Sequence, residues 1–183
     1  MKPPTIIDNI LSENNFRLLR DHAIQLSNTA GADDPGFGRK TYGGTDILKF
    51  IHRSLMPKAR EFFESDTLQP SFSMIAIYQG DQASLFRHKD DNACTYHFDI
   101  SIFHDEPWDI WVEHEGESKS YTLHPNQALA MYGEDQEHWR EEFPSNPSSL
   151  LCNAFFFFCE PEHWYFTKGP DYLHVIRQKY AKQ

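Results

Sequence analysis

Apolar residues recur at helical spacing in the first part of the chain. Between Ser12, which can cap a helix, and Gly31, where the helix should have ended, one stripe consists of Phe16, Leu19, Ala23 and Leu26. A second helix is predicted to begin near Thr45 or Asp46, with Pro57 as a kink or break. Its apolar stripe consists of Ile47, Phe50, Ile51, Leu55, Ala59 and Phe62. Both helices are expected to support a sheet.

The segment between these helices, Gly31–Gly44, has a different composition. It contains five glycines, one proline and two adjacent aspartates, and we predict a mobile loop with turns. Loops of this kind often cover active sites.

From Ser71 the apolar period falls from about 3.6 residues to 2, which predicts strands. After a first strand through Tyr78, further strands are predicted at Ser84–Arg87, Tyr96–Phe103, Asp109–Glu113, Ser120–Leu123, Ala128–Tyr132 and Leu150–Cys159. The run of four phenylalanines at 155–158 fits a central strand that is buried on both faces. Many short strands after a helical layer favour a mainly β fold with supporting helices, arranged as a sandwich or a barrel-like jelly roll.

Length and composition narrow the picture further. The chain has 183 residues and no stretch that divides it, so we expect one domain: helical support and a flexible loop at 1–70, a jelly-roll core with the site at 71–160, and a C-terminal extension at 161–183. A net charge of −10 disfavours nucleic acid as a partner, and no window approaches the roughly 18 apolar residues of a membrane span. Three cysteines without a CxxC pair argue against a disulfide scaffold, so we expect a cytoplasmic protein.

One split set of residues has the composition of a metal site. The triplet His88-Lys89-Asp90 closes a strand-like segment, and His138 follows His88 by 138 − 88 = 50 positions. Two histidines and one carboxylate on one face of a metal, with the other positions free, form the ligand set of non-haem Fe(II) oxygenases. The sequence therefore indicates oxygen chemistry at a site made by His88, Asp90 and His138.

Triplets of this form also recur by chance in a chain with 10 histidines and 27 acidic residues. His97-Phe98-Asp99 and His104-Asp105-Glu106 are two further examples. In the first of them, both polar residues share one face of an alternating strand, and the spacing does not decide whether that face points inward or to water. His88 and Asp90 are favoured because they lie where a strand ends and a turn begins.

The motifs around these ligands resemble the 2-oxoglutarate and Fe(II)-dependent dioxygenases of the prolyl-hydroxylase-like group. The resemblance covers roughly Ser71 to Glu160 and lies in Tyr78-Gln79-Gly80-Asp81, Leu85 to Asn92, Tyr132-Gly133-Glu134 and Glu137 to Glu141. It implies a double-stranded β-helix, or jelly roll, backed by the two N-terminal helices. It also implies Fe(II) as the metal and 2-oxoglutarate as a small-molecule co-substrate, and it admits ascorbate as a further cofactor.

The same resemblance suggests co-substrate residues and exposes a departure. A tyrosine at the position of Tyr78 lines the co-substrate pocket in this group, although a buried core tyrosine is an equal alternative. The group usually carries Arg or Lys on the last strand, about ten residues after the second histidine, to pair with the remote carboxylate. No basic residue occupies residues 147–153 here. Alternation returns Arg140 to the face of His138 and makes it the substitute candidate, unless it forms a surface ion pair with Glu141 or Glu142; Arg87 has the opposite parity to His88.

The resemblance implies hydroxylation of a C–H bond, in a peptide or a free amino acid such as proline. The Gly31–Gly44 segment and the aromatic stretch at 162–166 are candidates for walls of the substrate entrance. A nucleic-acid demethylase of the same superfamily is disfavoured, because the paired arginines of its motif are absent and the net charge is wrong. Two alternatives stay open: a cupin-type jelly roll that binds Zn, Mn or Ni without 2-oxoglutarate, and a non-catalytic protein-interaction domain.

Overall fold

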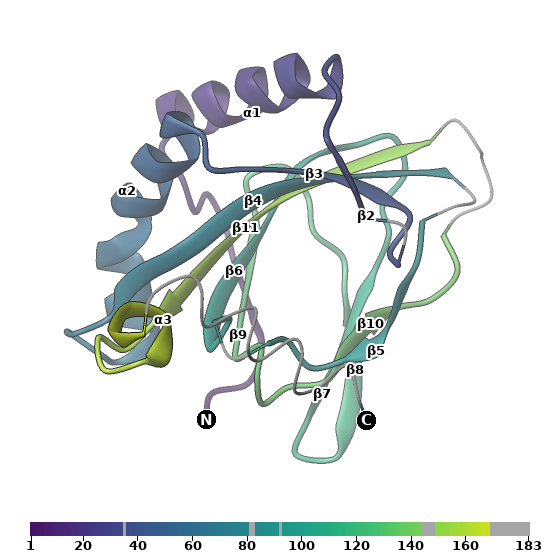
Figure 1. Ribbon diagram of the computed structural model, residues 1–183. Coiled ribbons are helices and arrows are strands. Elements are labelled where there is room, and N and C mark those ends of the chain that lie inside the picture. Colours follow the sequence, from purple (N-terminus) through teal and green to yellow (C-terminus); the bar gives the residue numbers. More distant parts are fainter. Residues whose placement is uncertain (35, 81–82, 92, 144–148, 169–183) are drawn as a thin grey trace.

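Two facing β-sheets form the centre of the molecule, and helices cover the outside of the larger sheet (Figure 1). A computed structural model describes residues 1–34, 36–80, 83–91, 93–143 and 149–168. The seven-stranded sheet has the order β1 (Thr5–Ile7), β9 (Ala128–Met131), β6 (Tyr96–His104), β11 (Leu150–Cys159), β4 (Gln69–Gln79), β3 (Arg39–Gly43) and β2 (Ala32–Asp34). The four-stranded sheet has the order β5 (Leu85–His88), β10 (His138–Arg140), β7 (Ile110–His114) and β8 (Glu117–Tyr121). The helices are α1 (Glu13–Ser27), α2 (Asp46–Phe63) and α3 (Trp164–Thr167).

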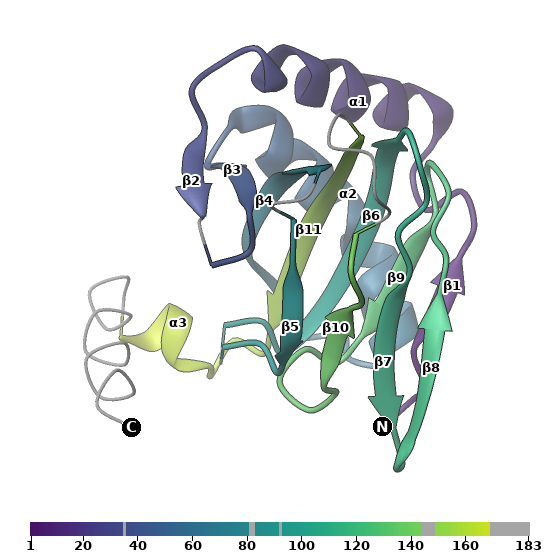
Figure 2. The same ribbon diagram turned by 90° about the vertical axis from the view of Figure 1, so that its right-hand side faces the viewer.

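The small sheet lies in front of the large one in Figure 2, and strands paired within each sheet run antiparallel. This architecture confirms the predicted mainly β class with supporting helices. The division at residues 70 and 160 stays a prediction, and most of the expected C-terminal extension lies outside the described residues. Within the described ranges, no helix is both long and apolar enough to cross a membrane.

Both long helices begin where the sequence predicted. The Ser12 side chain accepts a hydrogen bond from the backbone of Asn15, and Thr45 accepts one from Leu48, so each helix has a polar cap. The predicted break at Pro57 is wrong, because α2 continues through it to Phe63. Buried residues on both sides of the proline keep packing against the sheet, which offsets the lost backbone hydrogen bond.

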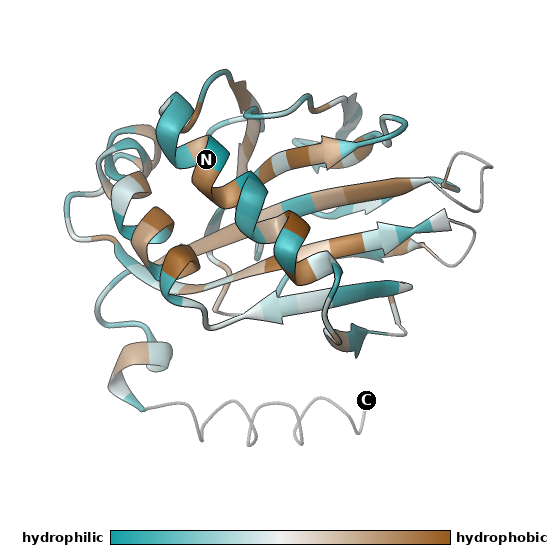
Figure 3. Cartoon of the chain, turned by 90° about the horizontal axis from the view of Figure 1, so that it is seen from above, coloured by the Kyte–Doolittle hydropathy of each residue, from teal (hydrophilic) through white to brown (hydrophobic). Residues whose placement is uncertain are grey.

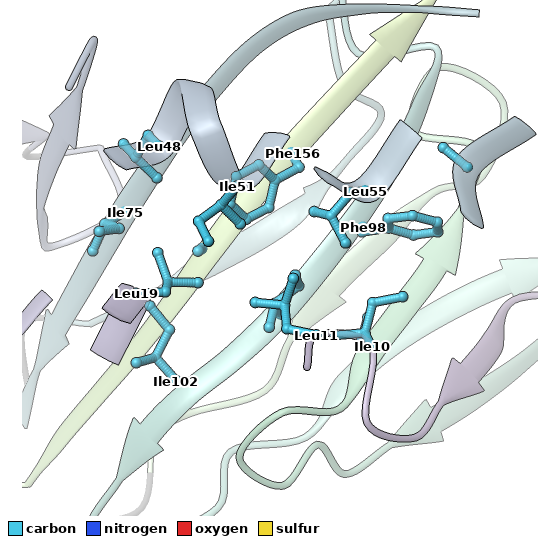
Figure 4. Packing of buried hydrophobic residues seen from close by; sticks show 14 of the residues in the cluster. Ile10, Leu11, Leu19, Leu48, Ile51, Leu55, Ile75, Phe98, Ile102 and Phe156 are labelled. Carbon is cyan, nitrogen blue, oxygen red and sulfur yellow. The ribbon is translucent and has the colours of Figure 1, made fainter. Parts of the chain in front are cut away.

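The main core lies between the helices and the outer face of the large sheet. Figure 4 shows apolar side chains from both layers in contact, among them Leu19, Leu48, Ile51, Leu55, Ile75, Phe98, Ile102 and Phe156. Along the helices, apolar patches alternate with hydrophilic ones (Figure 3), as one-sided burial requires. A second core fills the space between the two sheets.

Strand β6 contributes side chains to both sides of the large sheet, because its side chains alternate between its two faces. Phe98 and Ile100 pack in the main core under the helices, whereas His97, Asp99 and Ser101 point to the other face, between the sheets. The spacing of His97 and Asp99 did not show whether they face the interior or water, and the structure places both in the interior. The phenylalanine run at 155–158 lies on β11, a central strand, as predicted.

The predicted loop at Gly31–Gly44 is wrong in part, since it contains the hairpin of β2 and β3. Strand β3 pairs with β4, with Arg39 opposite Tyr78 and Tyr42 opposite Ile75. The edge of β4 that is not paired with β11 supplies backbone hydrogen-bonding partners for β3, which the local composition does not reveal. Strands β1 and β10 were not predicted, because three residues are too few to show a period. Strand β8 begins at Glu117, three residues before the predicted start.

Candidate metal centre

The structure brings His88, Asp90 and His138 together. Strands β5 and β10 pair so that His138 lies opposite His88, and Asp90 follows two residues after the end of β5. One ligand atom from each of the three side chains lies within 4.8 Å of the others. Asp90 Oδ1 is 3.7 Å from Nε2 of His88 and 3.7 Å from Nε2 of His138. Two imidazole nitrogens and one carboxylate oxygen therefore converge close enough to bind one metal ion together.

Backbone carbonyls fix the ring orientation of both histidines. His88 Nδ1 is 2.7 Å from the carbonyl oxygen of Phe86, and His138 Nδ1 is 3.0 Å from that of Gln136. Because a carbonyl only accepts, Nδ1 carries the proton in each ring, and the Nε2 lone pair faces Asp90. Burial lowers the pKa of His138 to about 4, against the opposing attraction of Asp90, so this ring is neutral at pH 7. A neutral imidazole is the form that binds a metal.

Two contacts hold the Asp90 carboxylate. Its backbone N–H donates to the carbonyl of Gly133 at 2.9 Å, and its Oδ2 accepts from His97 Nδ1 at 3.1 Å. Burial raises the pKa of Asp90, but the hydrogen bond from His97 and the neighbouring His138, His97 and His88 reverse that effect and leave the pKa lowered. The carboxylate is thus charged at neutral pH, and its Oδ1 lies 3.7 Å from Nε2 of each of the two candidate ligand histidines.

The backbone of Gly133 lies directly against this carboxylate. A Cβ at this position would overlap Asp90 Oδ2 and would lie 2.6 Å from the carbonyl oxygen of Cys94. Only glycine fits between these groups without a shift of one of them. The glycine of the Tyr132-Gly133-Glu134 motif therefore has a steric function next to the site.

A pocket extends from the three ligands between the two sheets. Its polar wall contains Arg39, Tyr78, Asp99 and Arg140. The apolar lining consists of Met74, Leu85, Ile110, Phe155 and Phe157. Cations, a phenol and a carboxylate thus lie beside the candidate metal position.

Arg140 lies inside this pocket, on the face of His138 as alternation predicted. Its side chain is 3% exposed, so the alternative of a surface ion pair does not apply. Nη1 donates to the carbonyl of Trp108, and Nη2 lies 3.4 Å from Asp99 Oδ2. Asn153, on the last strand, donates to Asp99 Oδ1 at 2.7 Å. Burial raises the pKa of Asp99, against the attraction of Arg140, which lowers it.

Tyr78 is buried and its hydroxyl meets Arg39. The Arg39 Nη1 donates to that hydroxyl at 2.7 Å, and burial raises the pKa of Tyr78 against the effect of the guanidinium. Sequence reasoning missed Arg39 because its strand was read as a loop. Arg87, as its parity predicted, points away from the pocket and forms ion pairs with Glu113 and Glu137 on the outer face.

An aromatic pair lies at the edge of the site. Phe37, in the turn between β2 and β3, stacks on Phe86 with ring centroids 5.0 Å apart. Both rings also lie against His88, at 5.6 and 5.3 Å. Phe86 is 58% exposed, so an apolar surface faces solvent directly beside a candidate ligand.

No family model and no curated protein matches the chain. Solved structures do share its fold. The non-heme alpha ketoglutarate dependent epimerase SnoN from nogalamycin biosynthesis superposes with a TM-score of 0.67 over 86% of this chain and 77% of its own, at 8% identity. A prolyl-4-hydroxylase from Pseudomonas putida gives 0.61 over 84% and 91%, at 11% identity. A prolyl hydroxylase from Trichoplax adhaerens, solved with a peptide fragment of hypoxia inducible factor, gives 0.62 over 85% and 83%, at 13% identity. The likeness confirms the predicted jelly roll.

Proposed function

We propose that this chain is an Fe(II)- and 2-oxoglutarate-dependent dioxygenase that hydroxylates a C–H bond. The observation that carries the proposal is the group formed by His88, Asp90 and His138, whose three ligand atoms converge within 4.8 Å. Two imidazole nitrogens and one carboxylate oxygen on one side leave coordination positions for small molecules, and this donor set suits Fe(II). The shared fold with 2-oxoglutarate enzymes supports the same assignment.

The residues around the three ligands fit this role. His88 and His138 present unprotonated Nε2 atoms because backbone carbonyls hold the opposite nitrogen, and His97 holds one oxygen of Asp90 so that the other is free to bind. Such supporting contacts orient ligands before the metal arrives. Iron with 2-oxoglutarate and oxygen would supply the oxidising power for an unactivated C–H bond. The protein contributes the orientation of the proposed ligands and a pocket most of whose lining residues are buried.

Tyr78 and Arg140 line the co-substrate end of the pocket in this proposal. A carboxylate that enters a buried space needs hydrogen-bond donors and a positive charge, because desolvation otherwise costs several kcal/mol. Among the described residues that line the pocket, the cationic side chains are Arg39 and Arg140.

The substrate end is the solvent-facing edge beside His88. We assign Phe37 and Phe86 as one wall of the entrance, since an exposed aromatic surface next to a candidate ligand suits an apolar part of a substrate. A peptidyl or free amino acid such as proline is the proposed substrate class. Two enzymes of this fold are prolyl hydroxylases, and one of them was solved with a peptide.

An anaerobic titration tests the proposal without knowledge of the substrate. The apo-protein is titrated first with Fe(II) and then with 2-oxoglutarate, and the visible charge-transfer band that follows chelation of protein-bound iron by the keto acid is recorded. We expect a saturable band that is lost in His138→Ala. Stoichiometric metal without a band would favour the cupin-type alternative, and no metal binding would favour an interaction domain.

A further inference from the structure

Two arginines are candidates to bind the remote carboxylate of the proposed co-substrate, 2-oxoglutarate. In the described part of the pocket they are Arg39, from β3, and Arg140, from β10. The last strand, β11, presents Leu151 and Asn153 on its inner face, where the group that the chain resembles usually has a basic residue. The contacts of each arginine decide between them.

Both terminal nitrogens of Arg140 are held by protein groups, whereas its buried Nε has no hydrogen-bond partner among the described residues. Its Nη2 faces the Asp99 carboxylate at 3.4 Å, its Nη1 donates to the carbonyl of Trp108, and its guanidinium lies 5.0 Å from the centre of the Trp108 ring. Asp99 has no exposed surface, so solvent does not screen this pair. A second carboxylate at Arg140 would approach the Asp99 carboxylate in a buried space, and the two negative charges would repel each other.

Arg39 has a different set of contacts. Its Nε pairs with Asp34 at 2.8 Å, and its Nη1 donates to the Tyr78 hydroxyl at 2.7 Å. Nη2 forms no hydrogen bond to any of the described residues. The Asp34 side chain is 28% exposed, so water screens part of its charge, whereas the Arg39 side chain is only 11% exposed. Arg39 thus lines the pocket and keeps one guanidinium nitrogen without a hydrogen-bond partner among the described residues.

The contact with Arg39 also orients Tyr78. A phenol that accepts a hydrogen bond from a guanidinium keeps its own proton for another acceptor. Arg39 and Tyr78 are opposite each other in the pairing of β3 with β4, and Tyr78 is opposite Leu151 in the pairing of β4 with β11. The three residues form one row across the sheet, so Arg39 lies two strands away from the usual position of the cation.

We infer that Arg39 and the Tyr78 hydroxyl together bind the carboxylate of the co-substrate that is remote from the metal, while Arg140 holds Asp99. This inference rests on the proposed function. A guanidinium donor and a phenol donor side by side present two hydrogen bonds to one carboxylate, and charge-assisted bonds of this type are the stronger ones. Phe37 supports the arrangement, because the Arg39 guanidinium lies 4.4 Å from the centre of its ring.

The test compares two keto acids that differ only at the remote end. 2-Oxoglutarate has a carboxylate there and 2-oxopentanoate has a methyl group, so the ratio of their dissociation constants isolates that contact. Both constants are measured from the anaerobic Fe(II) charge-transfer band in the wild type, Arg39→Gln, Arg39→Lys, Tyr78→Phe and Arg140→Gln. Lys40→Gln is the matched control, since Lys40 is the next residue, is exposed and lies on the opposite face of β3.

For Arg39→Gln we expect 2-oxoglutarate to bind about 30-fold more weakly and 2-oxopentanoate to bind as in the wild type. Arg39→Lys should restore part of the preference, Tyr78→Phe should lose part of it, and Lys40→Gln should leave it intact. An unchanged preference in Arg39→Gln, or an equal loss of both keto acids, would overturn the inference, as would a preference that collapses only in Arg140→Gln. A wild type that gives no band with either keto acid would instead refute the proposed function itself.

Discussion

His88 and His138 face each other across β5 and β10 with ring centroids 4.3 Å apart, and each donates its Nδ1 proton to the carbonyl two residues before it. The two strands thus present their histidines in the same way, although β10 has only three residues. Strand pairing fixes the distance between the rings, and the carbonyls fix their rotation. The geometry needed for a metal is therefore built by the backbone.

Removal of any one of the three proposed ligands should abolish metal binding at this site. We expect His88→Ala, Asp90→Ala and His138→Ala each to eliminate the charge-transfer band, because two remaining ligands no longer enclose the metal from one side. The far-ultraviolet circular dichroism spectrum should stay that of the wild type, since the main core lies on the opposite face of the large sheet. A full band in any of the three variants would exclude that residue as a ligand.

His97 should control metal affinity without binding the metal. In His97→Phe the hydrogen bond to Asp90 Oδ2 is lost, the carboxylate becomes free to rotate, and Co(II) should bind roughly 10- to 100-fold more weakly in competition with a chelating dye. His124→Asn, an exposed histidine outside the pocket, serves as the control and should bind Co(II) like the wild type. Wild-type affinity in His97→Phe would contradict the role of this contact.

Gly133→Ala should damage the site through steric overlap alone. The added methyl group would meet the Asp90 carboxylate and the Cys94 carbonyl, so Asp90 must move. We expect Co(II) affinity to fall at least about tenfold and the free energy of unfolding to fall by about 1–3 kcal/mol. Gly43→Ala is the matched control, because its Cβ would lie an ordinary 3.5 Å from the nearest atom. Equal metal affinities in the two variants would disprove the steric argument.

Arg140 should matter for folding more than an exposed arginine does. Arg140→Met leaves the fully buried Asp99 carboxylate without its cation, and urea unfolding at pH 7 should report a loss of about 3 kcal/mol. The double variant Arg140→Met/Asp99→Asn should recover part of that loss, since the second substitution removes the unpaired charge. Arg87→Met, on the outer face of the small sheet, is expected to cost less than about 1 kcal/mol. A stable Arg140→Met single variant would refute the pairing.

Buried His52 should make folding sensitive to acid. Its ring contacts the rings of Phe156 and Phe158, and its Nε2 is 2.9 Å from the carbonyl oxygen of Phe157. Burial lowers its pKa to about 4, from 6.5 in the unfolded chain. Between those values the unfolded state binds a proton that the folded state does not, so stability is complete above pH 6.5 and falls as the pH drops toward 4.

The expected contribution of His52 to this loss is about 3 kcal/mol, and the lowered pKa of His138 acts in the same direction. Urea unfolding of the metal-free protein at pH 7.5 and at pH 4.5 measures it. In His52→Gln the difference between the two pH values should shrink by most of the His52 contribution, whereas His124→Asn should keep the wild-type difference. The same difference in His52→Gln and in the wild type would rule out this origin.

Periodicity predicted the layers of helices and strands, and short motifs predicted that His88, Asp90 and His138 lie together. His88 and Asp90 stand at a strand end, and the family resemblance supplied the order and spacing that joined them to His138. Their role as metal ligands stays a prediction. The inward position of Arg140 followed from alternation with His138. The cap at Ser12 and the start of the second helix near Thr45 followed from local chemistry, which depends on neighbours in the sequence.

What the sequence did not reveal depends on partners far along the chain. Arg39 belongs to a strand only because the edge of β4 pairs with it, and the glycines around it predicted a loop. The inward direction of His97 and Asp99 is set by the helices that cover the opposite face of β6. The helix through Pro57 likewise persists because of tertiary packing.

Strand β6 has a consequence for how this protein can be altered. A shift of one residue in its pairing would turn His97 and Asp99 toward the helices and turn Phe98 into the pocket. Such a shift would disrupt the main core and the pocket together. The register of β6 therefore determines both the hydrophobic core under the helices and the polar pocket between the sheets. New chemistry at this scaffold is therefore accessible through replacement of individual side chains, and insertions or deletions within β6 are excluded.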